Sequence, residues 1–194
     1  MPLLDPAMCT VLLLNPDSTP LSGTNAPVSH VSKRQRLVRS AAAATAVPFY
    51  IASRMGKDGD DRQAVLDLPA DGAYSYSPAS LRNLWTDRGL SRTIAAHKRS
   101  SLIVAGSWLE IDVTFLTLTA LADGFDLHIL VDASPSQAAD IRQAAMDRII
   151  QAGAVPLSAP QMLGEWAERA QDDARRAALL ELVASEYPVG SSLT

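Results

Sequence analysis

The chain is poor in the residues that would mark several functional classes. It holds one cysteine among 194 residues, three histidines and a net charge of −4. A lone cysteine cannot form an intrachain disulfide, which favours a reducing compartment, and we expect a cytoplasmic protein. The small negative charge gives no basic footprint for nucleic acid, so we expect no nucleic-acid partner.

Long apolar runs are also missing. The longest tract, around residues 41–52, is too short to span a bilayer and contains Pro48, so no membrane partner is expected. The first residues, MPLLDPAMCTVLLL, lack a basic region and are interrupted by Asp5 and Pro6, which argues against a signal peptide. The remaining composition, 47% hydrophobic and 20% charged, is ordinary for a globular chain, and the length predicts one domain over residues 1–194.

Short apolar runs without alternation predict buried strands of a parallel sheet. They occur at residues 11–14, 48–52, 102–105, 125–131 and 155–158, with a further extended stretch at 73–78. Helical spacing of apolar residues is found between and after them, at residues 29–47, 80–87, 90–98, 115–123, 136–153, 160–170 and 172–186. Strands alternating with helices are typical of an α/β fold.

The stretch SLIVAGSWLEIDVTF, at residues 101–115, organises this pattern. A buried strand ends at Gly106 and Ser107, and from Glu110 the apolar spacing becomes helical. The start of a helix offers free N–H groups and the positive end of the helix dipole. Because open α/β sheets place their chemistry at such strand-to-helix turns, we expect the functional site here.

This turn resembles that of the isochorismatase-like superfamily of cysteine hydrolases, in which a strand leads through Ala-Gly-x-x-Thr-Glu/Asp-x-Cys-Val into a helix. The matching residues read Ala105-Gly106-Ser107-Trp108-Leu109-Glu110-Ile111-Asp112-Val113. The resemblance covers roughly residues 10–166. It implies a three-layer α-β-α, Rossmann-like fold with a six-stranded parallel sheet and helices on both faces. Residues from about 167 to 188 then form a C-terminal helical extension.

The resemblance also implies a catalytic triad of Cys, Asp and Lys, and all three positions are substituted. Asp112 stands at the position of the nucleophile, and Asn15 stands at that of the general base, where an amide cannot accept and return a proton. Residues 75–79, where the Lys is expected, contain no basic side chain. Asp17 is either a relocated carboxylate or a turn former. Asp112, Asn15 and Asp17 are therefore the candidate catalytic positions.

Five further residues are candidates for binding a substrate. By the resemblance, the Ser107–Trp108 peptide is expected to be cis and to direct the Trp108 N–H into the site as one oxyanion-hole donor. Glu110 matches a position that is usually structural in the family. Tyr74 and Tyr76 would line the pocket from the neighbouring extended stretch.

No metal site and no cofactor are expected. Nicotinamidase-type relatives place Asp and His ligands just after their second strand, but no histidine occurs between His30 and His97. The acidic run at residues 57–61 lacks the spacing of an EF-hand. His128 is interpreted as a packed strand residue, and Cys9 as a small buried one.

Three roles remain open. We favour a pseudoenzyme with a degenerate triad, which binds a small molecule or serves as a scaffold. The alternative is an active hydrolase of small amide, carbamoyl or vinyl-ether substrates that uses Asp112 in place of Cys, with Asp17 or Glu110 nearby. A purely assembly-related role is the third. Members of the branch that the chain resembles assemble, so we expect a homo-oligomer, and the apolar stripe of residues 178–183 covers either a neighbour or its own chain.

Overall fold

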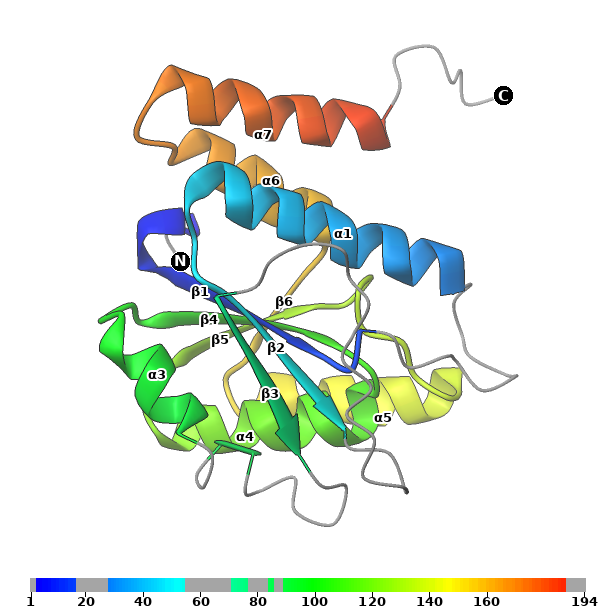
Figure 1. Cartoon of the computed structure of the whole chain (residues 1–194). Coiled ribbons are helices and arrows are strands. Elements are labelled where there is room, and N and C mark those ends of the chain that lie inside the picture. Colours follow the sequence, from blue (N-terminus) through cyan, green and yellow to red (C-terminus); the bar gives the residue numbers. More distant parts are fainter. Residues whose placement is uncertain (1–2, 17–27, 55–70, 77–83, 86–88, 188–194) are drawn as a thin grey trace, which may run out of the picture.

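Six parallel strands form the centre of the structure (Figure 1). This computed structural model describes residues 3–16, 28–54, 71–76, 84–85 and 89–187. Within those residues the strands lie in the order β3-β2-β1-β4-β5-β6, and all neighbours are parallel. They are β1 (Cys9–Leu14), β2 (Phe49–Arg54), β3 (Gly72–Tyr76), β4 (Ser101–Gly106), β5 (Asp126–Leu130) and β6 (Val155–Leu157). The predicted six-stranded parallel sheet is confirmed.

Strand β1 shows why an apolar run predicts a buried strand. All six of its residues are buried. Cys9, Val11 and Leu13 belong to a hydrophobic core on one face of the sheet, whereas Leu12 and Leu14 belong to the core on the other face. Because helices cover both faces, the four successive positions from Val11 to Leu14 are all apolar, and no alternation with polar residues develops there.

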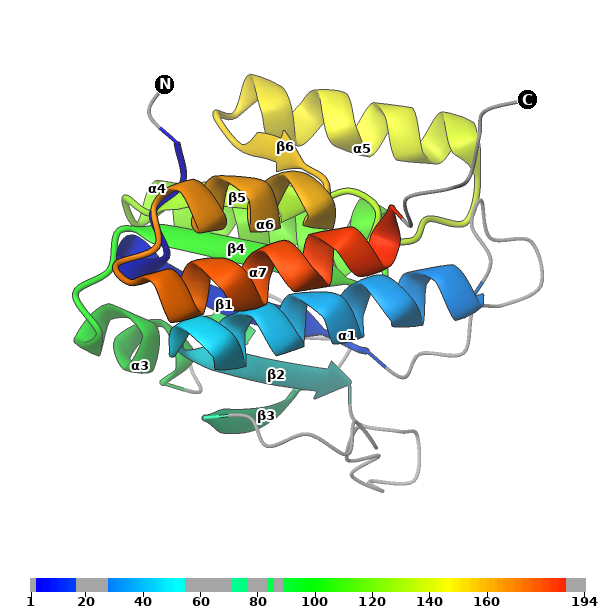
Figure 2. The same ribbon diagram turned by 90° about the horizontal axis from the view of Figure 1, so that it is seen from above.

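Helices lie on both sides of this sheet (Figures 1 and 2). One side is covered by α1 (Val28–Thr45) and α6 (Ala159–Glu168). The other is covered by α3 (Leu90–Ala96), α4 (Thr114–Ala122) and α5 (Ala139–Gln151). Leu84 and Trp85 are helical and pack in the second core, while the rest of the predicted 80–87 helix lies outside the described residues. The predicted three-layer α-β-α architecture is confirmed.

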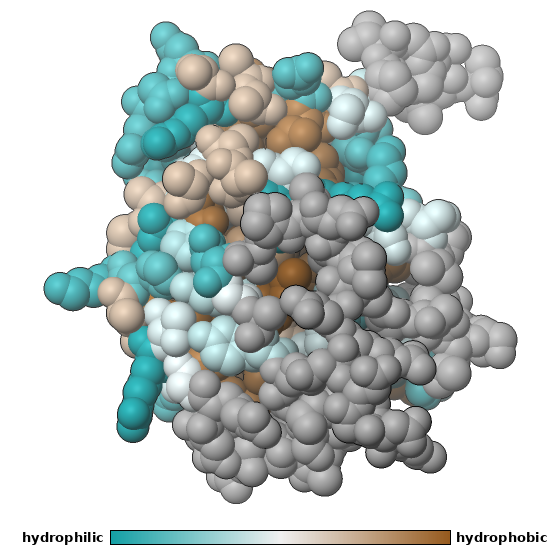
Figure 3. All heavy atoms as spheres, viewed as in Figure 1, coloured by the Kyte–Doolittle hydropathy of each residue, from teal (hydrophilic) through white to brown (hydrophobic). Residues whose placement is uncertain are grey.

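The last helix, α7 (Asp173–Glu186), forms an outer layer over α1 and α6 (Figures 1 and 2). Leu179 is fully buried, and Val183 packs partly buried against the same core. Arg34 of α1 forms an ion pair with Glu186 at the end of α7. Figure 3 shows hydrophilic residues at the top of the molecule, where α7 lies, with weakly and strongly hydrophobic residues between them. The apolar stripe of α7 therefore packs on its own chain.

Candidate functional site

The carboxyl ends of β1 and β4 lie side by side where the strand order reverses. Leu14 and Gly106 pair at the end of the β1–β4 ladder, and on the other side the Asn15 N–H donates to Ala52 O in β2 at 2.8 Å. Ligands of open α/β sheets bind outside the carboxyl ends of the strands at such a switch point. The turn within residues 101–115 thus lies at the edge of the sheet where this fold places its chemistry.

Gly106 allows β4 to pass close to β1 just before the turn. Its φ is +132°, and a Cβ at this position would lie 1.9 Å from Leu14 O. The next residue, Ser107, donates its N–H to that same oxygen at 3.0 Å. Any side chain would therefore collide with the backbone of β1 and force an unfavourable φ. The glycine of the motif keeps the two strand ends in contact.

The turn after β4 directs a backbone donor at Asp112. The Ser107–Trp108 peptide is cis, which confirms the prediction. The Trp108 N–H donates to Asp112 Oδ2 at 3.3 Å. Asp112 itself lies in a π-helical turn, η3 (Leu109–Val113), in which the Val113 N–H donates to Trp108 O at 3.1 Å. The sequence predicts helical spacing here but not this wider turn.

The side-chain amide of Asn15 joins the two strand ends. Its Nδ2 donates to Ser107 O at 2.6 Å and to Asp112 Oδ2 at 2.9 Å. The backbone of Asn15 has a φ of +45°, a left-handed conformation that asparagine tolerates better than most residues. The exposed fractions of Asn15, Ser107 and Asp112 are 4%, 3% and 2%. The residues at the predicted base and nucleophile positions thus form a buried, hydrogen-bonded pair.

The loop after β5 supports the turn. The Leu109 N–H donates to Pro135 O at 3.0 Å, and the Gly106 N–H donates to Ser134 Oγ at 3.3 Å. Arg142 of α5 donates to two carbonyl oxygens of this loop, at 2.7 and 2.5 Å. The family resemblance includes the loop but gives no signal for Arg142. Its guanidinium holds the loop against the helix, so it acts on the site through the backbone.

Two of the predicted binding residues have partners on neighbouring elements. Glu110 Oε1 accepts a hydrogen bond from the Gln137 N–H at 3.1 Å, ahead of α5. Tyr74 in β3 donates its hydroxyl to Thr93 Oγ1 of α3 at 3.0 Å. These contacts direct Glu110 toward the loop before α5 and Tyr74 toward α3.

Two other predicted residues are only partly covered by the structure or not at all. Asp17 lies outside the described residues. Tyr76 is the last residue of β3, and the structure describes its backbone but not its side chain.

Over the described ranges, no three His, Cys, Asp or Glu side chains lie close enough together to hold a metal ion. Among the helices described, none is both long and apolar enough to cross a membrane.

Residues 78–161 match the family described as the isochorismatase domain. This part of the chain is therefore similar to an isochorismatase domain. A curated relative, the probable hydrolase YcaC of Escherichia coli (strain K12), is 34% identical to the chain over 84 residues. These residues make up 43% of this chain and 40% of YcaC, so the aligned part spans less than half the length of that relative.

Solved structures with the isochorismatase fold extend the likeness over nearly the whole chain. YcaC from Pseudomonas aeruginosa, with hexane-2,5-diol and covalent acrylamide, has a TM-score of 0.79 at 22% identity and covers 95% of this chain and 93% of its own. The YcaC gene product from Escherichia coli, described as an octameric hydrolase of unknown specificity, has a TM-score of 0.76 at 24% identity, covering 95% and 92%. At these identities the likeness establishes a shared fold.

Proposed function

We propose that this isochorismatase-fold chain is a pseudoenzyme, a non-catalytic member with a degenerate triad that binds a small molecule or serves as a scaffold. The observation that carries the proposal is the 2.9 Å hydrogen bond from Asn15 Nδ2 to Asp112 Oδ2. These two residues occupy the positions at which the resemblance implies the general base and the nucleophile. They bind each other instead of activating a nucleophile.

Neither side chain is suited to the chemistry of the family. That chemistry needs a thiolate nucleophile and a carboxylate that takes its proton. The Asn15 amide has no basic site at neutral pH. Asp112 Oδ2 accepts hydrogen bonds from Asn15 and from the Trp108 N–H, so an attack through this oxygen would require both to break. The pair is better suited to holding the strand ends together than to catalysis.

The alternative is an active hydrolase of small amide, carbamoyl or vinyl-ether substrates, in which Asp112 replaces the cysteine. Two observations support it. The Trp108 N–H beside Asp112 is a donor of the kind that stabilises an oxyanion. In addition, the YcaC relatives from Escherichia coli are described as hydrolases. In this reading Asp112 acts as nucleophile or base, with Asp17 or Glu110 as the second carboxylate.

Hydrolysis assays on a panel of small amides, carbamoyl compounds and vinyl ethers separate the two functions. Asp112→Asn removes the carboxylate at nearly constant size, and Asp112→Ala removes the whole polar group. For a pseudoenzyme we expect no turnover by the wild type or either variant, while a compound of the panel raises the Tm of the wild type. Turnover that both variants lose would establish the hydrolase. Ser185→Ala, on the exposed side of α7, is the matched control.

We also propose that the chain forms a homo-oligomer in the cytoplasm. The YcaC gene product of Escherichia coli is described as octameric. Phe115 and Ile111, four residues apart beside the site, are 54% and 37% exposed, and large exposed apolar side chains favour association. Light scattering should give a mass several times that of one chain, and the mass of a single chain would contradict assembly.

The proposed cytoplasmic location rests on the cysteine content, because Cys9 is the one cysteine of the sequence and a reducing compartment keeps such a thiol free. Cell fractionation tests this location.

A further inference from the structure

The helix α4 carries no charged residue. Its sequence, TFLTLTALA, consists of apolar residues and threonines. Figure 1 shows α4 at the bottom of the molecule, on the opposite side of the sheet from α7. A surface helix of a soluble protein normally presents charged and polar residues to water, whereas a helix that is apolar all round is normally buried. The composition of α4 therefore indicates that its outward side is covered in the native protein.

This outward side, together with the end of the preceding turn η3, is exposed in the single chain. Phe115 and Ile111 are 54% and 37% exposed, and Ala122, the last residue of α4, is exposed as well. Leu118 and Thr119 lie between them and are half-buried. Spacings of three and four residues place all five on one side of the helix. We refer to these five residues as the α4 face.

The polar groups on and beside the α4 face are already hydrogen-bonded within the chain. The hydroxyl of Thr119 donates to a backbone oxygen one turn earlier, at 2.8 Å. Glu110 borders the face at one end and accepts a hydrogen bond from the Gln137 N–H at 3.1 Å. Asp123 borders it at the other end and accepts one from Trp85 Nε1 at 2.6 Å. An apolar partner can therefore cover the face without leaving these groups unsatisfied.

The spacing of the α4 face makes it complementary to a second copy of itself in the antiparallel direction. In a two-fold contact centred between residues 116 and 117, the protruding Phe115 lies opposite the half-buried Leu118 of the partner subunit. Ile111 lies opposite Ala122 of the partner subunit, so a large side chain meets a small one at each end. The antiparallel direction also places the positive end of each helix dipole beside the negative end of the other.

We propose that two copies of the chain pack their α4 faces against each other, antiparallel, about a two-fold axis. This proposal rests on the homo-oligomer proposed above and names the surface that forms one of its contacts. One helix face is smaller than the surface that a stable dimer buries, so the α4 pair would be the apolar centre of the contact and the residues around it the rim. Because Ile111 precedes Asp112 in η3, the contact would lie beside the candidate site of each subunit.

Light scattering of the full chain tests the contact. Phe115→Asp places a charge at the centre of the α4 face and should raise the dissociation constant of the two-fold contact by at least about 100-fold. The mass should then fall to about half that of the wild type or less. Leu180→Asp is the matched control, because Leu180 is 45% exposed but lies on α7, on the other side of the sheet (Figure 1). It should leave the mass unchanged.

A mixture of variants separates a broken contact from a misfolded chain. In the proposed contact the two copies of residue 115 lie within one helical turn of each other along the helix axis, on either side of the two-fold axis. Phe115→Lys should therefore dissociate the contact as Phe115→Asp does. A mixture of the two variants pairs opposite charges across the axis, so it should recover most of the wild-type mass.

Cysteine variants test the antiparallel direction. Ile111 and Ala122 are about 16 Å apart along the helix axis, so in the antiparallel contact each lies close only to the other residue of the partner subunit. In a Cys9→Ala background, mild oxidation should join chains when the Ile111→Cys and Ala122→Cys variants are mixed. Either variant alone should stay unjoined, since a disulfide needs Cα atoms within about 7 Å of each other.

Several results would overturn the proposal. A wild-type multimer whose mass Phe115→Asp leaves unchanged would contradict the α4 contact, while the proposed homo-oligomer would stand on another surface. A wild-type chain with the mass of a single copy would overturn both proposals and leave the α4 face to a different partner. A mixture of the two charged variants that stays dissociated, or disulfides formed by each cysteine variant alone, would contradict the antiparallel two-fold contact.

Discussion

Asn15 Nδ2 donates hydrogen bonds both to Ser107 O, at 2.6 Å, and to Asp112 Oδ2, at 2.9 Å, and so ties the end of β1 to the turn after β4. Asn15→Asp would replace the donor with a second buried carboxylate beside Asp112. We expect the free energy of unfolding at pH 7 to fall by roughly 2–4 kcal/mol, because like charges meet and Ser107 O loses its partner. Urea denaturation measures this loss.

A double variant, in which Asn15 and Asp112 exchange their side chains, is the control for this prediction. Asn15→Asp combined with Asp112→Asn restores one amide and one carboxylate with their roles reversed, so most of the lost stability should return. The single variant should also recover part of its stability as the pH is lowered and one of its two carboxyl groups takes up a proton. If the double variant is as unstable as the sum of the single ones, the hydrogen bond is not what holds the pair together.

Gly106→Ala tests the close approach of β4 to β1. An alanine Cβ would lie 1.9 Å from Leu14 O at a φ of +132°, so the backbone must shift. We expect a loss of more than about 3 kcal/mol in unfolding free energy. Gly164→Ala in α6 is the matched control, because nothing lies within 4 Å of the added methyl group and the helix should gain about 0.5–1 kcal/mol. Equal effects of the two changes would contradict the steric argument.

Cys9 should be inert in the folded protein. It is fully buried, its Sγ donates to Asp5 O at 3.0 Å, and burial raises the pKa of its thiol to about 12. Since the thiolate is the reactive form, iodoacetamide at pH 8 should leave the native chain unmodified and add one group after unfolding in urea. Mass spectrometry counts the added groups, and Cys9→Ala should show none in either state. Rapid labelling of the native chain would contradict the burial of this thiol.

The sheet and its switch point follow from the sequence because they depend on strong local signals. Runs such as residues 102–105 are apolar at every position, which a strand buried on both faces requires. Gly106 ends one such run and Asn15 ends another. Because the carboxyl ends of parallel strands meet at one edge of a sheet, the proximity of Asn15 and Asp112 can also be predicted.

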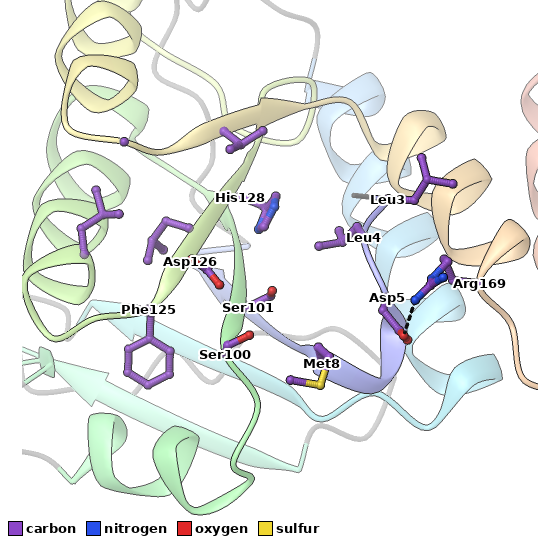
Figure 4. Close-up of a pocket in the computed structure, with 14 residues that line it drawn as sticks. Leu3, Leu4, Asp5, Met8, Ser100, Ser101, Phe125, Asp126, His128 and Arg169 are labelled. Atoms are coloured by element: carbon purple, nitrogen blue, oxygen red, sulfur yellow. Dashed lines mark hydrogen bonds and ion pairs between the residues drawn. The ribbon is translucent and has the colours of Figure 1, made fainter. Parts of the chain in front are cut away.

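Other features depend on packing that no local pattern records. The spacing of Leu109 and Val113 fits an α-helix as well as the π turn that places Asp112. Arg142 reaches its loop across the start of α5, and a single arginine in a helix gives no indication of such a contact. A histidine in an apolar strand predicts burial, which is confirmed for His128, but not whether its ring has a partner. Residues far apart in the sequence, such as Leu4 of the N-terminal segment and Val155 of β6, line one cavity at the amino ends of the strands (Figure 4), which no local pattern predicts.

His128 should make stability depend on pH. Burial lowers its pKa in the folded chain, with Asp126 and Glu165 acting in the opposite direction. The unfolded chain, whose histidine pKa is about 6.5, then takes up a proton before the folded chain does, so the free energy of unfolding falls as the pH drops below about 6.5. His128→Leu should remove this part of the pH dependence and, by replacing a buried polar ring with an apolar side chain, raise stability at pH 8 by about 1 kcal/mol. His30→Gln, an exposed change on α1, should leave the wild-type curve as it is. Urea denaturation at pH 5 and pH 8 measures all three proteins, and a His128→Leu curve parallel to that of the wild type would show that this ring is not the group that titrates.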